Sequence, residues 1–150
     1  MRAVIQRVSS AQVAVANHPI SRIERGLLIF LGVAAGDTLA DAEWLAQKIA
    51  TLRIFSDDEG RMNRSVIDLA GELLVVSQFT LIASTRKGTR PSFNHAAPPD
   101  QAIPLYAGFI GELEGHLGRP VSVGRFGAEM AVQLVNDGPV TLIIDTARRE

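Results

Sequence analysis

The sequence contains no cysteine among its 150 residues. This absence excludes disulfide bonds, thiolate nucleophiles and sulfur-ligated zinc. A chain without cysteine also fits a reducing compartment, so we expect a cytoplasmic protein.

Long apolar runs are absent as well. No run approaches the ~20 apolar residues that span a bilayer. Met1 to Ala3 lead directly into an alternating strand pattern instead of a signal sequence. We therefore expect no membrane partner, and we expect the first residues to belong to the fold.

Neither sign of charge is in excess, because 15 basic and 16 acidic residues give a formal net charge of -1. This balance argues against a protein that coats long nucleic acids, so we expect no DNA partner. Contact with a short nucleic acid end stays open. Basic residues are most concentrated at Arg86, Lys87 and Arg90. This segment is either a solvated loop or a phosphate-binding site, and composition does not separate the two.

What the sequence does contain is enough apolar residues for one core. A length of 150 residues with 47% hydrophobic content predicts a single domain over residues 1–150. Alternating patterns and short apolar runs predict strands at 2–8, 12–16, 27–33, 53–55, 73–76, 121–125, 131–137 and 140–144.

Two helices are predicted between these strands. The first follows Asp37 or Thr38 and extends to about residue 52, and the second follows Asp100 and ends before Gly118. Strands with two interspersed helices and short links predict an α+β fold, with a curved, barrel-like and mostly antiparallel sheet.

A small polar cluster, Ser77-Gln78-Phe79-Thr80, directly follows an apolar strand and contains no acid, base or histidine. In one interpretation, a buried strand simply ends in residues that face solvent. In the other, the backbone N–H groups and the Ser77 and Thr80 hydroxyls polarise a carbonyl and hold its oxyanion, while the Gln78 amide orients the substrate.

The segment Asn136-Asp137-Gly138-Pro139-Val140-Thr141 is rich in turn-forming residues and is typical of a hairpin. However, Pro139 stands between two strong strand patterns, where a missing N–H is poorly tolerated. A cis Gly138-Pro139 bond resolves this conflict, because proline allows the cis form at a cost of about 0.5 to 1 kcal/mol.

No general base is apparent. The three histidines, His18, His95 and His116, lie in a turn, a proline-rich loop and a helix end, and only His95 is near the polar cluster in sequence. The acidic turn at residues 57–60 lacks the ligand spacing of a calcium loop. We expect no metal and no cofactor.

The two segments around residues 77–81 and 136–141 together resemble the signature motifs of the D-aminoacyl-tRNA deacylase family. The resemblance continues through residues 90–93 (Arg-Pro-Ser-Phe), 124–126 (Gly-Arg-Phe) and 2–8, so it covers essentially the whole chain. It implies a homodimeric enzyme that cleaves the ester between a D-amino acid, or glycine, and the terminal adenosine of tRNA. L-aminoacyl esters are left intact.

The resemblance also implies roles for individual residues. A cis Gly138-Pro139 turn of one subunit enters the site of the other, where its carbonyl oxygens receive the α-amino group and its bulk excludes an L side chain. Arg7 resembles the residue that fixes this turn, and Phe126 and Met130 are expected to bind substrate. Arg86, Lys87 and Arg90 are then candidate tRNA contacts.

For the chemistry, we expect the Phe79 and Thr80 amides to hold the oxyanion, with the Thr80 hydroxyl in support and the ribose 2'-OH activating water. An alternative makes Thr80 a covalent nucleophile. Two other functions stay open at this point: a noncatalytic module that binds an RNA end or adenosine, and a general small-ester hydrolase that uses Ser77 or Thr80.

Overall fold

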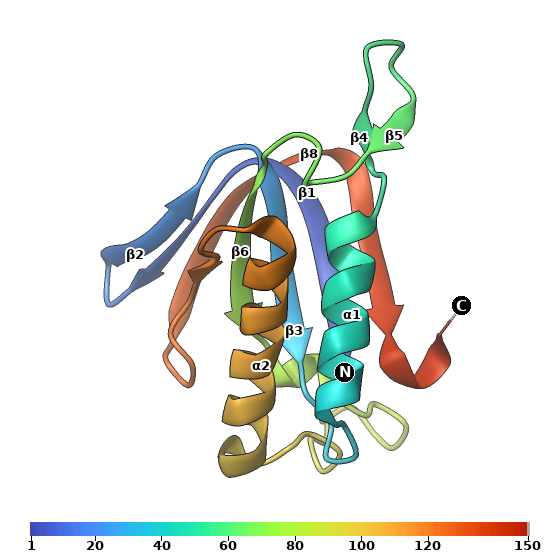
Figure 1. The fold of residues 1–150 in the computed structure, drawn as a ribbon. Coiled ribbons are helices and arrows are strands. Elements are labelled where there is room, and N and C mark those ends of the chain that lie inside the picture. The colour runs from blue at the N-terminus through green and yellow to red at the C-terminus, as the bar shows by residue number, and fades with distance from the viewer. Residues whose placement is uncertain (150) are drawn as a thin grey trace.

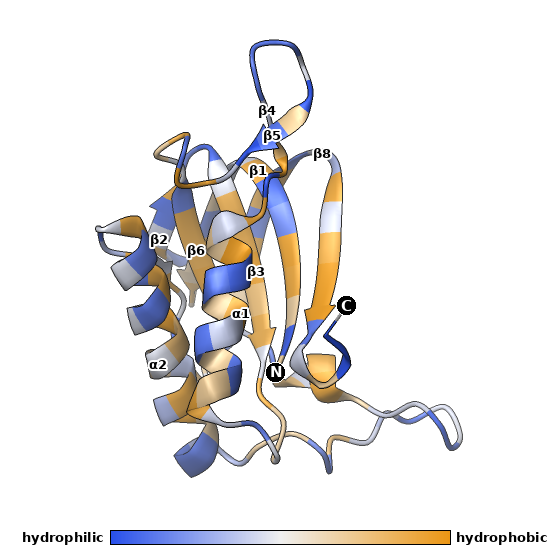
Figure 2. Cartoon of the chain, turned by 45° about the vertical axis from the view of Figure 1, so that its right-hand side comes forward, coloured by the Kyte–Doolittle hydropathy of each residue, from blue (hydrophilic) through white to orange (hydrophobic). Residues whose placement is uncertain are grey.

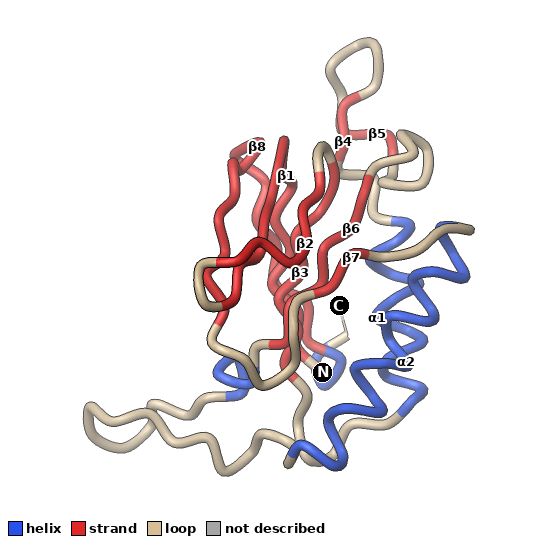
Figure 3. The backbone as a smooth tube through the Cα atoms, turned by 90° about the vertical axis from the view of Figure 1, so that its left-hand side faces the viewer, coloured by secondary structure: helices blue, strands red, loops and turns tan. Residues whose placement is uncertain are grey.

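We describe residues 1–149 from a computed structural model. A six-stranded mixed sheet forms the body of the molecule, and two helices cover one of its faces (Figures 1 and 3). The strands are β1 (Arg2–Val15), β2 (His18–Ile23), β3 (Gly26–Gly32), β6 (Glu72–Ser77), β7 (Ser122–Val123) and β8 (Met130–Asp145), with a separate hairpin of β4 (Phe55–Ser56) and β5 (Met62–Arg64). The helices are α1 (Leu39–Thr51) and α2 (Pro99–Leu117), with the short 3-10 helices η1 (Phe79–Ile82) and η2 (Thr146–Arg148).

The long strand β1 organises the sheet. Along one edge it pairs antiparallel with β3 and then with β2, and along the other it pairs antiparallel with β8. Strands β3, β6 and β7 are parallel. The Ser21 hydroxyl of β2 donates to the Val123 carbonyl of β7 at 2.7 Å, which brings the two ends of the sheet together. The predicted α+β fold with a curved, barrel-like sheet and two main helices is confirmed.

Strand β3 lies at the centre because it is apolar on both faces. Leu27, Ile29 and Leu31 belong to the core beneath the helices, whereas Leu28 belongs to a second core inside the curved sheet. Figure 2 shows this concentration of hydrophobic residues in the strands, against the polar outer sides of the helices. The continuous apolar run therefore positions β3 and its neighbour β6 rigidly between two packed layers.

The helix boundaries differ in one detail from the sequence prediction. Thr38 is the N-cap of α1 as expected, and its N–H donates to the Asp41 carboxylate at 2.9 Å. Asp100, however, does not cap α2: Pro98 is the cap and Pro99 is the first helical residue. Proline is favoured at this position because the N–H that it lacks would have no acceptor within the helix. Gly118 ends α2 with a φ of 67°, as predicted. Neither helix combines the length and apolarity that a membrane span requires.

The strand predicted at 53–55 is displaced, because β4 covers only Phe55–Ser56. Two further strand predictions were wrong. Residues 2–8 and 12–16 do not form two strands, because Ser10 keeps its pairing with Val135 and β1 continues to Val15. Residues 131–137 and 140–144 do not form a hairpin either. Both halves pair with β1 in one direction, with Gln6 opposite Thr141 and Val8 opposite Asn136. The turn formers at 137–140 thus make a bulge opposite Arg7 within one strand.

Candidate active site

The carboxyl end of β6 carries the polar cluster. Ser77 pairs with Leu31 of β3, and the Gln78 N–H donates to the Leu31 carbonyl at 2.8 Å before the chain turns into η1. Gly32 allows this close approach, since a Cβ there would lie 2.9 Å from the Gln78 carbonyl oxygen. The end of β6 and the start of η1 are therefore held directly against the central strand.

A cavity of about 560 Å³ opens beside this strand end, within the size range of small-molecule sites. It lies between the ends of β3 and β6, the first turns of α2, and the segment that leads into β8. Its lining residues are Leu31, Val33, Val76, Ser77, Gln78, Phe79, Ala97, Pro99, Ala102, Tyr106, Phe126, Gly127, Ala128, Met130 and Val132.

The cavity brings together several residues predicted from sequence. Ser77, Gln78 and Phe79 form one part of its wall, and Phe126 and Met130 form another. Thr80 follows directly in η1 but is exposed and does not line the cavity. The two groups are separated by about fifty positions in the sequence and meet because β7 pairs with β6.

Two backbone N–H groups, one at this wall and one directly beside it, are available to a ligand. Phe79 and Thr80 are the first residues of η1, where N–H groups have no acceptor within the helix. Within residues 1–149 neither group donates a hydrogen bond to another segment. The Gln78 Nε2 amide donates to the Thr80 hydroxyl. This hydrogen bond holds the Thr80 side chain beside the free N–H groups.

Tyr106 was not singled out in the sequence analysis, yet it lines the cavity from α2. Its buried hydroxyl donates to the Val75 carbonyl at 3.0 Å, and desolvation raises the pKa of Tyr106 to about 12. Its ring meets Phe126 edge to face, with centroids 5.8 Å apart. The signal that pointed to Tyr106 is weak: a polar-tipped ring on the apolar side of a helix.

Met130 closes the cavity against Gly124. A Cβ at Gly124 would lie 2.7 Å from the Met130 sulfur, and the Arg125 N–H donates to that sulfur at 3.3 Å. The Gly124 N–H also donates to the Val75 carbonyl at 2.9 Å, so this oxygen receives two hydrogen bonds. The flexible thioether of Met130 thus packs over Gly124, which is itself hydrogen-bonded to β6.

The cavity offers no acid, no histidine and no basic side chain. Of the lining residues only Tyr106 can ionise, and its raised pKa keeps it neutral. His95 is exposed and contributes only its backbone carbonyl, which accepts from the Ala35 N–H at 3.0 Å. In the part of the chain that we describe, no three His, Asp or Glu side chains gather as a metal site. The wall can polarise a carbonyl, but no side chain in it removes a proton.

The second signature segment lies elsewhere on the sheet. The Gly138-Pro139 bond is cis, and both residues are exposed. Arg7 is buried beneath them: its Nε donates to the Asp137 carbonyl at 3.0 Å, and its Nη1 donates to the Ile54 carbonyl at 2.6 Å. Gly138 and Pro139 do not line the cavity of their own chain.

Register places the two segments apart. Arg7 pairs with Leu27, at the start of β3, whereas Ser77 pairs with Leu31, four residues further along. At ~3.3 Å per residue this is about 13 Å along the strand. Asn136 also holds the turn, because its side-chain amide donates to the Arg7 carbonyl at 2.9 Å and to the Val140 carbonyl at 3.2 Å.

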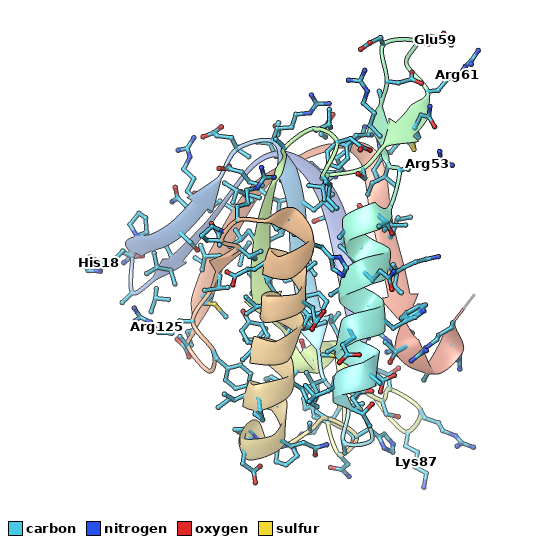
Figure 4. The ribbon with its side chains drawn as sticks, in the orientation of Figure 1. His18, Arg53, Glu59, Arg61, Lys87 and Arg125 are labelled. Atoms are coloured by element: carbon cyan, nitrogen blue, oxygen red, sulfur yellow. The ribbon has the colours of Figure 1, made fainter. Side chains whose placement is uncertain are left out.

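The predicted tRNA contacts Arg86, Lys87 and Arg90 are exposed in a loop that follows η1. Backbone hydrogen bonds between Ser84 and Ser92, at 2.8 and 2.9 Å, close the base of this loop. Figure 4 shows Lys87 at the end of the molecule opposite the β4–β5 hairpin, which carries Glu59 and Arg61. The cations lie outside the cavity wall, on the side where η1 leaves it.

Comparison with known proteins identifies relatives over the full chain. The family model described as D-Tyr-tRNA(Tyr) deacylase matches residues 4–145. A protein of Opitutus terrae named D-aminoacyl-tRNA deacylase is 68% identical over 150 residues, with all of both chains covered. A protein of the same name from Roseiflexus castenholzii is 62% identical over 147 residues, covering 98% of this chain and 93% of the relative.

Solved structures share the fold. A structure titled "c-Myc DNA Unwinding Element Binding Protein" matches with a TM-score of 0.90 at 40% identity, covering 97% of this chain and 98% of that one. A probable eukaryotic D-amino acid tRNA deacylase matches with a TM-score of 0.82 at 18% identity, over 95% and 97% of the two chains, which shows the fold alone. Both the sequence relatives and the family model thus agree with the resemblance seen in the two signature segments, and the chain belongs to the D-Tyr-tRNA(Tyr) deacylase family of enzymes.

Proposed function

We propose that this protein hydrolyses the ester bond of D-aminoacyl-tRNA, and of glycine mischarged on a noncognate tRNA, and so acts in translation proofreading in the cytoplasm. Family membership supports the reaction. The observation that carries it here is a cavity at whose wall two backbone N–H groups lack acceptors within residues 1–149, beside a strand end with no ionisable side chain.

In this proposal the Phe79 and Thr80 N–H groups receive the carbonyl oxygen of the ester. They lie at the amino end of η1, where both N–H groups are available as donors to a developing oxyanion. The Thr80 hydroxyl accepts from the Gln78 amide, so its own proton is free to donate to the same oxygen. Ser77 lies at the entrance of η1 and contributes a second hydroxyl to the wall.

Water is the nucleophile, and because the cavity lacks a base, a hydroxyl of the substrate orients the water and relays its proton. The ribose 2'-OH next to the ester directs the attack of water on the carbonyl carbon. The tetrahedral intermediate then collapses, the bond to the 3' oxygen breaks, and that oxygen takes up the proton that water lost. Free amino acid and tRNA leave.

A covalent mechanism through Thr80 is less compatible with this site. A threonine nucleophile needs a base that accepts its proton. Its hydrogen-bonded neighbour in the structure is the Gln78 amide nitrogen, which is a donor. The contact supports an orienting role for the Thr80 hydroxyl.

The terminal adenosine occupies the cavity in this proposal. Phe126, before β8, and Met130, the first residue of β8, line that space, and together with Tyr106 they offer flat and polarisable surfaces to a purine. The volume of about 560 Å³ fits a ligand of this class. The cations Arg86, Lys87 and Arg90 lie outside, where the phosphates of the acceptor end emerge.

Chiral selection requires a rigid wall near the α-carbon, and we assign it to Gly138 and Pro139 of a second copy. In its own chain this turn is exposed, is anchored by Arg7, and does not line the cavity. A homodimer in which each copy presents its turn to the other's cavity completes both sites. Carbonyl oxygens of the turn receive the α-amino group, while the proline ring occupies the space of an L side chain.

The test is incubation of the protein with matched D- and L-aminoacyl-tRNA, with release of free amino acid as the readout. We expect hydrolysis of the D ester and survival of the L ester. Equal cleavage of both, or of neither, contradicts the proposal, and trapping of an acyl group on Thr80 or Ser77 would instead favour a general ester hydrolase.

A further inference from the structure

An exposed aromatic pair stands beside the cavity. The rings of Phe79 and Phe93 meet edge to face, with centroids 5.1 Å apart and an interplanar angle of 70°. Phe79 is 57% exposed and Phe93 is 36% exposed, although both are large apolar residues. Phe79 also lines the cavity, so the pair forms part of its rim.

Cations follow directly outside this rim. The loop closed by Ser84 and Ser92 carries Arg86, Lys87 and Arg90, and Phe93 comes immediately after it. None of these three cations pairs with a carboxylate in residues 1–149. From Leu73 to Pro99 the sequence contains no acidic residue, in a chain whose net charge is -1.

Aromatic rings beside unpaired cations are the arrangement by which proteins hold single-stranded nucleic acids. Bases stack on the rings, and the cations receive the phosphates. We propose that Phe79 and Phe93 form a stacking surface for the nucleotides that precede the terminal adenosine, whose phosphates reach Arg86, Lys87 and Arg90. This inference rests on the proposed function, because it takes the acceptor end of tRNA as the ligand.

A second copy of this chain is a less suitable occupant of the same surface. In a twofold contact between identical patches, the three cations of one loop would meet the same three cations of the other, and like charges repel. Strand β8 offers a better self-association surface, since it contains no basic residue and exposes Val135 and Ile143, the latter at 71%.

The surface makes binding depend on the number of nucleotides. Adenosine alone fills the cavity, whereas an oligonucleotide that ends in adenosine also covers the aromatic rim. The trinucleotide CpCpA is therefore expected to bind more tightly than adenosine. Phe93 contributes to this difference without touching the cavity.

The experiment is titration calorimetry of the full-length protein with adenosine and with uncharged CpCpA, at one fixed salt concentration. We expect Phe93→Ala to reduce the advantage of CpCpA over adenosine by about 5- to 150-fold, the usual effect of removing one stacked ring. Adenosine affinity is expected to stay unchanged, which also shows that the variant is folded. Phe93→Tyr keeps the advantage, because it keeps the ring.

A matched control is Ile103→Ala, which removes a 48% exposed apolar side chain from α2 and leaves both affinities unchanged. Equal affinity of the wild-type protein for the two ligands would overturn the inference, and so would an equal loss for both ligands in Phe93→Ala. Dissociation of a dimer by Phe93→Ala at an unchanged CpCpA advantage would assign the rings to a second copy.

The two proposals fail in different ways. Hydrolysis of D-aminoacyl-tRNA without any CpCpA advantage rejects the stacking surface alone. A Phe93-dependent CpCpA advantage without ester hydrolysis rejects the proposed reaction and leaves the stacking surface in place.

Discussion

The strand end at residues 77–80, beside the cavity, and the turn at residues 137–139 are built in opposite ways. At the cavity, the groups available to a ligand are backbone N–H groups and hydroxyls in an uncharged wall. At the turn, Gly138 and Pro139 expose apolar groups, and the charges belong to the buried guanidinium of Arg7 and the Asp137 carboxylate that it pairs with at 3.1 Å.

In the proposed function, this difference separates two tasks within one chain. A wall that polarises a carbonyl must leave its donors without partners until substrate arrives. A turn that excludes a side chain must instead have its own polar groups hydrogen-bonded, so that its backbone does not move when the side chain presses against it. Arg7 and Asn136 hold the turn in this way, whereas the Phe79 and Thr80 N–H groups are left open.

The largest expected effect comes from removing the support of the turn. Arg7→Ala leaves the Ile54 and Asp137 carbonyls without their guanidinium donor, and we expect a loss of about 2–4 kcal/mol in the free energy of unfolding. Urea denaturation measures it. Arg25→Ala is the control, because Arg7 and Arg25 both lie over the Phe55 ring, at 6.0 and 5.8 Å, but Arg25 is exposed, and its loss should stay below about 1 kcal/mol. Equal losses would show that Arg7 does not support the turn.

The next effect separates selection from catalysis. Pro139→Ala removes the ring that we assign as the wall, so the preference for D over L esters, measured as the ratio of the two kcat/KM values, should fall about 10-fold or more. Turnover of the D ester should change little. Thr141→Ala, an exposed change on the same strand, should alter neither value. Full rejection of L esters by the Pro139 variant would refute the assignment.

A smaller effect is expected at Thr80, beside the cavity. Thr80→Ala keeps the backbone N–H and removes only the hydroxyl, so kcat should fall by about 3- to 10-fold, well below the ~100- to 1,000-fold loss that follows removal of an oxyanion donor. Thr80→Ser should restore the rate. A loss beyond about 1,000-fold in single-turnover assays would identify Thr80 as a nucleophile.

The smallest effect concerns pH. Desolvation raises the pKa of Tyr106 to about 12, and no other lining side chain ionises, so kcat/KM should show no side-chain inflection between about pH 6 and 9. Tyr106→Phe should keep the same profile and cost about 1 kcal/mol of stability, because Val75 still accepts from Gly124. Since the fold favours the neutral phenol, the contribution of Tyr106 to the free energy of unfolding is complete below about pH 10 and is lost as pH rises towards 12. An inflection near neutrality would indicate a titrating base.

Much of the fold follows from local patterns. The apolar run of β3, the stripe of α1 that follows Thr38, and the stop at Gly118 depend on periodicity and backbone conformation, which the sequence displays directly. The path of β8 does not. Asn136 to Pro139 have the composition of a hairpin, and only pairing with β1 on both sides keeps the chain in one direction. The propensities of neighbouring residues do not show which distant strands will pair.

The site shows the same limit. Ser77 to Thr80 are recognisable because polar residues interrupt an apolar run. The position of Tyr106 in the cavity lining, by contrast, depends on how α2 packs over β6. The separation between the cavity and the Gly138-Pro139 turn also emerges only from strand register. Sequence indicates candidate functional segments, whereas packing decides which of them share a cavity.

The central claim is that the catalytic wall and the excluding turn of one working site come from two copies of the chain. The most direct test is a mixed dimer of one copy with a filled cavity, Ala128→Trp, and one copy with an altered turn, Pro139→Ala, purified through two different tags. Only the Pro139→Ala copy keeps an open cavity, and in our account that cavity faces the intact turn of its partner. We predict that the mixed dimer cleaves D esters and rejects L esters, unlike either parent dimer. Cleavage of L esters at the rate of the Pro139→Ala dimer would show that each chain's turn serves its own cavity, and would contradict the account.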